Sequence, residues 1–265
     1  MSWFENLNPI VQALIATTFT WGVTALGALM VCFFKNINKK VLNTILGFSA
    51  GVMLAASFWS LLSPAIELSN ELGYIAWLLP TIGFAVGGLF VLFSDRFLDK
   101  VLKNNRSLKS ADSLKRSILL VSAITVHNIP EGMAVGVAFG GIASGVPGVT
   151  LIGAVMLALG IGIQNFPEGA AVSLPLRNEG LSRMKSFMYG QASALVEPIS
   201  AVIGTILVLK IRSFLPFLLS FAAGAMIAVV ARELLPESVK ENKNLATLGL
   251  IFGFTLMMIL DVALG

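Results

Sequence analysis

The sequence contains few charged residues and almost no cysteine or histidine. Only 12% of its 265 residues are Asp, Glu, Lys or Arg, whereas about 25% are charged in a typical soluble domain. A soluble globular domain is therefore excluded. The single cysteine, Cys32, cannot form a disulfide within the chain. The single histidine, His127, leaves too few imidazoles for a catalytic zinc ion.

Two catalytic motifs are absent as well. The sequence has no G-x-x-x-x-G-K-[ST] loop, so it does not encode nucleotide hydrolysis, and it has no His-Glu-x-x-His motif of a zinc hydrolase. Its isoelectric point is basic, near 9.3, but the lysines and arginines are spread over several loops rather than gathered in one groove with aromatic residues. We therefore expect no nucleic-acid partner and no organic cofactor.

Long apolar runs dominate the chain, since 56% of the residues are hydrophobic and the mean hydropathy is +0.87. Eight runs approach the roughly 20 residues that a helix needs to cross the hydrocarbon core of a bilayer. We predict an all-α, polytopic membrane protein with one transmembrane domain over residues 1–265 and the lipid bilayer as its surroundings. The predicted spans are residues 9–34, 42–66, 74–95, 117–140, 147–174, 186–209, 214–236 and 245–263.

The positions of Lys and Arg predict how these spans are oriented. Of the 18 basic residues, 15 lie in the connections after the first, third, fifth and seventh spans or at the adjoining helix ends. Basic connections stay on the cytoplasmic side. We therefore predict a multi-pass protein of the plasma or inner membrane, with both termini outside the cytoplasm.

Two apolar runs contain related polar motifs, His127–Gly132 and Gln164–Gly169, which read HNIPEG and QNFPEG. A carboxylate inside a membrane costs roughly 2.5 to 3.5 kcal/mol, so each motif needs a partner, and a cation is the simplest one. If both runs are helical, residues three and four apart share a face. Each motif then presents a carboxylate beside imidazole or carboxamide groups. Each proline removes a backbone N–H, and the following glycine loosens the helix further, so we predict a kinked, broken helix at each motif.

The sixth run repeats this pattern, because Glu197 is followed by Pro198. Three carboxylates, one imidazole and three carboxamides could bind one or two divalent cations. Other roles remain open: the carboxamides could join helices by hydrogen bonds, and Glu197 could pair with Arg232. The candidate metal ligands are His127, Asn128, Glu131, Gln164, Asn165, Glu168 and Glu197.

Two further segments resemble each other. Residues 48–55 read FSAGVMLA and residues 221–228 read FAAGAMIA, an offset of 173 residues. The segments lie in the second and the seventh predicted spans, with four spans between them, so they cross the membrane in opposite directions. This favours an inverted 3+2+3 repeat, in which the first three spans match the last three and the fourth and fifth spans form the central pair. Small residues common in packed membrane helices are the alternative explanation.

These features resemble the ZIP (Zrt/Irt-like) family of divalent metal transporters and, within it, the prokaryotic GufA-like branch. The likeness covers nearly the whole chain and includes the two Pro-Glu-Gly motifs, Glu197-Pro198 and the Arg-Glu-Leu-Leu-Pro-Glu stretch at residues 232–237. It implies a site that is frequently binuclear. One metal would bind His127, Glu131, Gln164 and Glu168, with Met53 as a soft contact, and the second would bind Asn128, Asn165 and Glu197, with Glu131 and Glu168 as bridges.

Three residues depart from the family pattern. Many family members have a histidine where this chain has Gln164, and an acidic residue is common where it has Asn165. A carboxamide oxygen is a weaker ligand than imidazole or carboxylate, so we expect a second metal position that is weak or regulatory. Arg232 stands where relatives typically have a metal-binding histidine, next to Glu233 in the exit pathway. An arginine cannot bind metal, and we predict that it neutralises Glu197 or Glu233 after the metal has left.

The resemblance implies transport of zinc, or of cadmium, iron or manganese, into the cytoplasm by elevator-like alternating access, often in a homodimer. We therefore predict that the protein is not an enzyme and that the metal is its substrate. The rival interpretations are an intramembrane metal-dependent hydrolase and a metal-sensing membrane protein. Both predict that no metal crosses the membrane.

Overall fold

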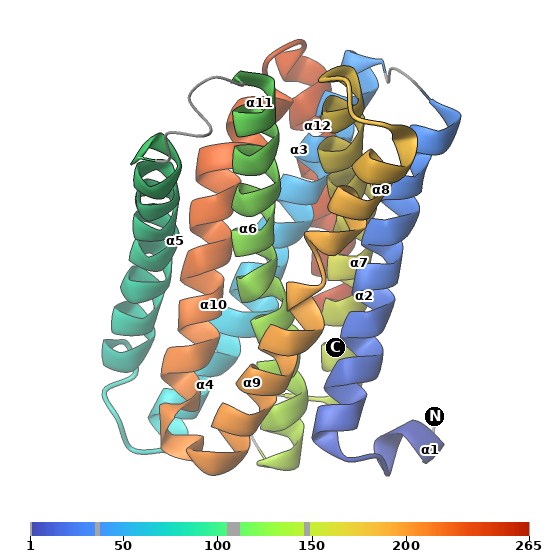
Figure 1. The fold of residues 1–265 in the computed structure, drawn as a ribbon. Coiled ribbons are helices and arrows are strands. Elements are labelled where there is room, and N and C mark those ends of the chain that lie inside the picture. The colour runs from blue at the N-terminus through green and yellow to red at the C-terminus, as the bar shows by residue number, and fades with distance from the viewer. Residues whose placement is uncertain (1, 35–37, 105–111, 146–148, 265) are drawn as a thin grey trace.

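The computed structural model describes residues 2–34, 38–104, 112–145 and 149–264. All regular structure in these residues is helical, with no strand, which confirms the all-α prediction. The long helices run side by side in one bundle (Figure 1). The elements are α1 (Ser2–Glu5), α2 (Pro9–Phe33), α3 (Lys39–Ala56), η1 (Ser57–Leu62), α4 (Ser63–Glu71), α5 (Leu78–Asn104), α6 (Asp112–Ala143), α7 (Leu151–Asn178), α8 (Arg183–Ala192), α9 (Val196–Lys210), η3 (Arg212–Phe214), α10 (Leu215–Val229), η4 (Val230–Leu234), α11 (Leu235–Ser238), α12 (Lys243–Ile259) and η5 (Leu260–Leu264).

Six helical stretches within the described residues are long and apolar enough to cross a membrane. Polar side chains cap the start of several of them: Asn8 accepts a hydrogen bond from Ile10 N at 2.9 Å, and Thr150 accepts one from Gly153 N at 2.9 Å. The protein is therefore a multi-pass membrane protein. The six stretches are Pro9–Phe33, Lys40–Glu71, Leu151–Arg177, Arg183–Lys210, Leu215–Ser238 and Lys243–Ala263.

Four pairs of helices account for the most extensive packing: α3 with α12, α2 with α7, α10 with α5, and α6 with α9. Glycines allow the backbones in these pairs to approach closely. A Cβ atom added at Gly51 would lie 2.1 Å from the Leu250 carbonyl oxygen, and one at Gly224 would lie 2.0 Å from the Phe84 carbonyl oxygen. Small residues at helix contacts are the usual means of tight packing in membranes.

The predicted helix breaks at the two Pro-Glu-Gly motifs are wrong. Helix α6 continues through Pro130, and α7 continues through Pro167. A proline removes only one hydrogen bond of its helix, and close packing against neighbouring helices holds both segments helical. An interruption does occur in the sixth predicted span, where residues 193–195 form a turn between α8 and α9. Glu197 therefore lies in the first turn of α9, beside a helix break as predicted.

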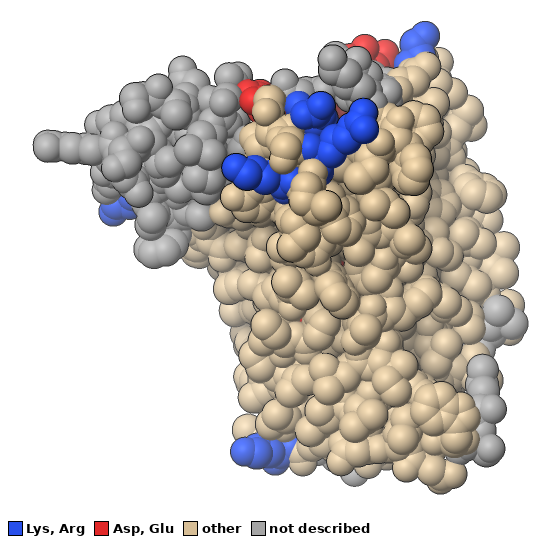
Figure 2. Space-filling model, turned by 45° about the vertical axis from the view of Figure 1, so that its right-hand side comes forward, with Lys and Arg blue, Asp and Glu red and all other residues tan. Residues whose placement is uncertain are grey.

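The two ends of the bundle differ in charge. Most of the Lys and Arg side chains visible in Figure 2 gather at one end, and a wide band of uncharged residues covers the flank below them. The end of α2, the start of α3 and the connections from α7 to α8 and from α11 to α12 lie at the upper end in Figure 1, whereas α1 and the described end of the chain lie in the lower half. An uncharged band between polar ends is the surface expected of a protein in a bilayer.

Candidate metal site

The two Pro-Glu-Gly motifs meet inside the bundle. Gln164 on α7 donates a hydrogen bond from Nε2 to Glu131 Oε1 on α6, at 2.6 Å. Both side chains are completely buried. Helix α3 approaches the same level, because Ser49 Oγ donates to the Gln164 carbonyl oxygen at 3.4 Å. The motif copies thus lie against each other, far from water.

A third helix supplies Glu197, which is also completely buried. Asn165 donates from Nδ2 to Glu197 Oε1 at 2.9 Å, and the hydroxyl of Thr20 on α2 donates to Glu197 Oε2. The turn before α9 contributes as well, since the Ser193 carbonyl oxygen accepts a hydrogen bond from Asn128 Nδ2 at 3.0 Å. Hydrogen bonds therefore join α2, α6, α7 and α9 around the motifs.

The three carboxamides in the motifs all use their NH₂ groups, and not their carbonyl oxygens, to form hydrogen bonds with the described residues. Asn128, Gln164 and Asn165 each donate their NH₂ group to an oxygen of the protein. Their carbonyl oxygens point elsewhere and, like Glu131 Oε2, are buried without a hydrogen-bond partner among the residues that the structure describes. Leaving a buried polar atom unsatisfied costs about 1 to 3 kcal/mol. A cation can satisfy such an oxygen atom, just as a hydrogen-bond donor can. These four atoms therefore favour a positively charged ligand.

Three acidic side chains contribute negative charge at this level. Glu131 and Glu197 are completely buried and Glu168 is 8% exposed. The three carboxylates are close enough to repel one another. Among the described side chains, no three His, Cys, Asp or Glu groups form a metal cluster by themselves. A metal ion here would therefore depend on the carboxamide oxygens as well as on the carboxylates, a donor set that suits hard or borderline divalent cations.

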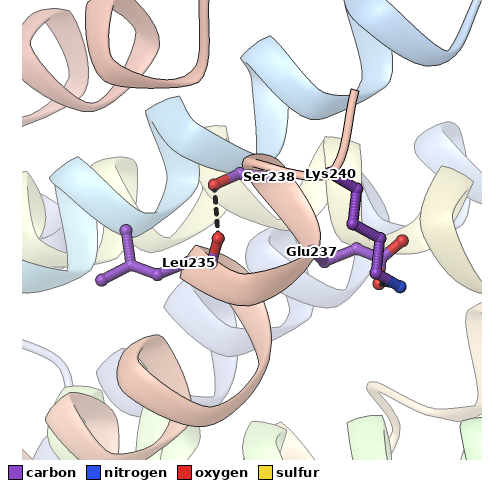
Figure 3. A network of polar contacts seen from close by, with 4 residues as sticks. All are labelled: Leu235, Glu237, Ser238 and Lys240. Atoms are coloured by element: carbon purple, nitrogen blue, oxygen red, sulfur yellow. Dashed lines mark hydrogen bonds and ion pairs between the residues drawn. The ribbon is translucent and has the colours of Figure 1, made fainter. Parts of the chain in front are cut away.

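A cavity of about 460 Å³ connects this site with one end of the bundle. Glu168 lines it, as do Arg232 and Glu233 on η4 and the more exposed Glu237 and Lys240. At its rim Lys240 forms an ion pair with Glu237, and Ser238 Oγ donates to the Leu235 carbonyl oxygen at 2.9 Å (Figure 3). Pro236 and Glu237 of α11 line the cavity, and α11 lies at the upper end of the bundle in Figure 1.

The glycine of each motif serves packing rather than flexibility. A Cβ atom at Gly132 would lie 2.3 Å from both the Glu197 carbonyl oxygen and Ser200 Oγ. One at Gly169 would lie 2.0 Å from the Thr24 carbonyl oxygen. These glycines let α6 contact α9, and α7 contact α2, at the level of the acidic residues. The prediction that they loosen their helices is therefore wrong.

The remaining candidates differ in how the structure describes them. The side chain of His127 lies outside the described residues, although its backbone belongs to α6. Met53 is completely buried on α3, one helical turn after Ser49. Arg232 and Glu233 line the cavity rather than the hydrogen-bonded cluster. The alternative role of Glu197, a pairing with Arg232, stays a prediction.

Sequence reasoning missed Thr20. Three threonines, Thr17, Thr20 and Thr24, are buried on one face of α2. This spacing of polar residues in an apolar span was the signal that could have indicated a role. The sequence alone could not distinguish Thr20, which contacts Glu197, from Thr17, whose hydroxyl donates to the Ala13 carbonyl oxygen of its own helix at 2.7 Å.

The fold and the site together define a helical membrane protein with a buried, acidic site suited to cations. The model of the family described as ZIP Zinc transporter matches residues 7–116 and 103–261. The chain is 40% identical to zinc transporter ZIP11 of Xenopus tropicalis, over 98% of this chain and 99% of the relative. It is 34% identical to zinc transporter GufA of Myxococcus xanthus, over 95% of this chain and 98% of the relative. It is 36% identical to zinc transporter ZIPB of Bordetella bronchiseptica, over 98% of this chain and 84% of the relative.

The chain belongs to the ZIP family of zinc transporters. The predicted resemblance is thus confirmed, and the protein is a transporter, not an enzyme. The comparisons give no support to an intramembrane hydrolase or to a metal sensor.

Proposed function

We propose that this protein transports zinc into the cytoplasm through the site between α6 and α7. The observation that carries this proposal is a set of four buried oxygen atoms without hydrogen-bond partners in the described part of the chain, on Asn128, Glu131, Gln164 and Asn165. They lie beside carboxyl groups that are buried close to one another, and a cation would offset the repulsion between these groups. The relatives' names point to zinc as the substrate. Cadmium, iron and manganese are further candidates, because oxygen donors bind several divalent metals.

The ligands that we propose are Glu131 and Glu168, with the carboxamide oxygens of Asn128, Gln164 and Asn165. His127 and Met53 remain candidate ligands on the strength of the motif and the family likeness. Metal would arrive hydrated and exchange its water for these oxygens. Release requires that binding be weak enough to reverse, and carboxamide oxygens are weaker ligands than carboxylates.

The direction of transport rests on the cavity beside α11. This cavity reaches Glu168 from the end where most of the basic residues lie. By the positive-inside rule that end faces the cytoplasm, and both termini then lie outside it, in the plasma or inner membrane. The described conformation would accordingly be one that opens inward. A homodimer remains a prediction, since one chain alone is described.

Alternating access would follow from eight spans with inverted repeats in a single transporter domain. Three observations support this arrangement. The π-helical segments η1 and η4 begin at residues separated by the same offset as the repeated sequences. The pairing of α3 with α12 corresponds to that of α10 with α5, and the pairing of α2 with α7 corresponds to that of α9 with α6. Gly51 and Gly224 occupy matched positions at two of these contacts. We propose an elevator-like movement of the site between the two sides.

Zinc flux tests this function directly. Purified protein in liposomes is expected to take up radioactive zinc faster than empty liposomes, with unlabelled cadmium, iron, manganese and cobalt competing to different degrees. ATP outside the liposomes should leave the rate unchanged, because the chain has no nucleotide-binding loop. Absence of flux from folded protein would refute the proposal, and it is the outcome that a hydrolase or a sensor predicts.

Arg232 provides a second, smaller prediction. It shares the cavity with Glu168 and Glu233, and we propose that its charge offsets these carboxylates after metal release. Arg232→Ala is expected to slow zinc uptake roughly threefold, the size of effect typical of partly exposed charges. Lys240→Ala at the rim is the control and should leave the rate nearly unchanged. Unchanged uptake and stability in Arg232→Ala would remove the basis for this role.

A further inference from the structure

Thr20 connects α2 to the acidic site through two different groups. Its hydroxyl donates a hydrogen bond to Glu197 Oε2, and its backbone carbonyl accepts one from Asn165 Nδ2 at 3.3 Å. The residue is completely buried, as are both of its partners. Thr20 lies outside both Pro-Glu-Gly motifs, so neither motif assigns it a role.

Both oxygens of Glu197 accept hydrogen bonds. Oε1 accepts from Asn165 Nδ2 at 2.9 Å, and Oε2 accepts from the Thr20 hydroxyl. In contrast, Glu131 Oε2 and the carbonyl oxygens of Asn128, Gln164 and Asn165 have no hydrogen-bond partner among the described residues. The protein therefore satisfies both oxygens of Glu197 and leaves these four oxygens for a ligand.

The orientation of Asn165 follows from Glu197. Glu197 Oε1 accepts a hydrogen bond from Asn165 Nδ2, so the amide turns its NH₂ group toward this oxygen. The same NH₂ group also donates to the Thr20 carbonyl oxygen. Asn165 Oδ1 is thereby directed away from Glu197 and remains without a partner. The Thr20 hydroxyl positions Glu197, and Glu197 positions the Asn165 oxygen.

A metal ion at Glu197 would have to break these contacts. One divalent cation matches the two negative charges of Glu131 and Glu168. Two hydrogen bonds from the protein stabilise the third acidic side chain, Glu197. A second divalent cation bound at Glu197 would have to displace the Thr20 hydroxyl or the Asn165 amide, and the displaced donor would lose its partner inside the buried site.

We propose that Thr20 is a positioning residue of the transport site, and that the Thr20–Glu197–Asn165 hydrogen bonds limit this site to a single divalent cation. The inference rests on the proposed function and specifies how many ions the site takes. It assigns Glu197 to hydrogen bonding instead of metal coordination. Likeness to the family implies a second metal position at Glu197. In our proposal the Thr20 hydroxyl and the Asn165 amide bind Glu197 there in place of a metal ion.

Metal content per chain tests the limit to one ion. Purified full-length protein would be dialysed to equilibrium against zinc or cadmium, and bound metal would be counted by mass spectrometry. We expect one ion per chain at saturation. Asn165→Asp replaces the amide donor with a carboxylate, and we expect this variant to bind two ions. Two ions bound to the unmutated protein, reduced to one by Glu197→Gln, would overturn the proposal.

The role of Thr20 is tested by a matched set of variants on α2. Thr20→Val keeps the shape of the side chain but removes the hydroxyl, and we expect the dissociation constant for cadmium to rise about tenfold, since hydrogen bonds to charged groups contribute about 1.5 to 3 kcal/mol. Thr20→Ser keeps the hydroxyl and should restore affinity. Thr17→Val removes a hydroxyl that bonds only within its own helix, so it should bind cadmium like the unmutated protein.

Equal affinities of Thr20→Val and Thr17→Val would show that Thr20 has no positioning role. Should Thr20→Val fail to fold, the ion count of the unmutated protein still decides whether the site holds one ion. The zinc flux of that same protein separates the two proposals. Flux with two ions bound would refute this inference alone, whereas folded protein without flux would refute the proposed function.

Discussion

Glu131→Gln is expected to lower the initial rate of zinc uptake into proteoliposomes by about 100-fold or more. The substitution keeps the shape of the side chain and its hydrogen bond with Gln164 Nε2, which is 2.6 Å long in the unmutated protein. It removes one of the two charges that offset a divalent cation in a completely buried site. A rise of about 2.7 kcal/mol in the activation free energy of transport corresponds to a 100-fold lower rate. This is less than the cost of leaving a buried charge without its partner, about 3 to 5 kcal/mol.

The control is Glu71→Gln, an exposed carboxylate at the end of α4. Its uptake should match that of the unmutated protein at equal amounts of reconstituted transporter. Size-exclusion profiles would establish that both variants are folded. Uptake by Glu131→Gln within about twofold of the control would mean that the buried charge is not required for transport.

Gly132→Ala is expected to lower the midpoint of thermal unfolding by roughly 5 °C or more, because overpacking a tight contact costs about 1 to 3 kcal/mol. The added Cβ would lie 2.3 Å from the Glu197 carbonyl oxygen and from Ser200 Oγ. The Glu197 carbonyl oxygen belongs to the backbone, so it cannot move without displacing α9 from α6. Since α9 carries Glu197, zinc uptake should fall together with stability.

Gly22→Ala is the matched control, because a Cβ at this helical position would meet no atom within 4 Å. It should unfold at the same temperature as the unmutated protein or slightly above, since alanine favours helices over glycine. Unfolding would be followed by heating samples in detergent and measuring the folded fraction by size-exclusion chromatography. If both variants unfolded at the same temperature, the close contact between α6 and α9 would not exist as described.

Local patterns predicted much of this architecture. Apolar runs located the helices, because a helix in lipid must satisfy its own backbone and cover it with apolar side chains. For the second run, the predicted residues 42–66 lie within the observed stretch Lys40–Glu71. The spacing within each motif placed Glu131 on one helix face with His127, and Gln164 on one face with Glu168; the structure joins Glu131 and Gln164 by a hydrogen bond. These features depend on residues near one another in the sequence.

Features that depend on distant partners were not predictable in the same way. The glycines of the motifs suggested loosened helices, but their role becomes visible only when α9 and α2 are placed against them. Thr20 resembled its neighbours on α2, since buried threonines commonly bond to their own helix. Its contact with Glu197 joins residues 177 positions apart, a distance over which the sequence pattern carries no signal. The orientation of the carboxamides likewise follows from tertiary contacts alone.

The central claim is that the acidic residues of α6 and α7 hold a single divalent cation within the membrane. Anomalous X-ray scattering from crystals of the protein grown with cadmium tests it most directly. The account predicts one strong peak in the bundle, contacted by carboxylate oxygens of both Glu131 and Glu168. A bound ion elsewhere in the membrane-spanning region, with Glu131 and Glu168 sharing no contact to it, would contradict the account.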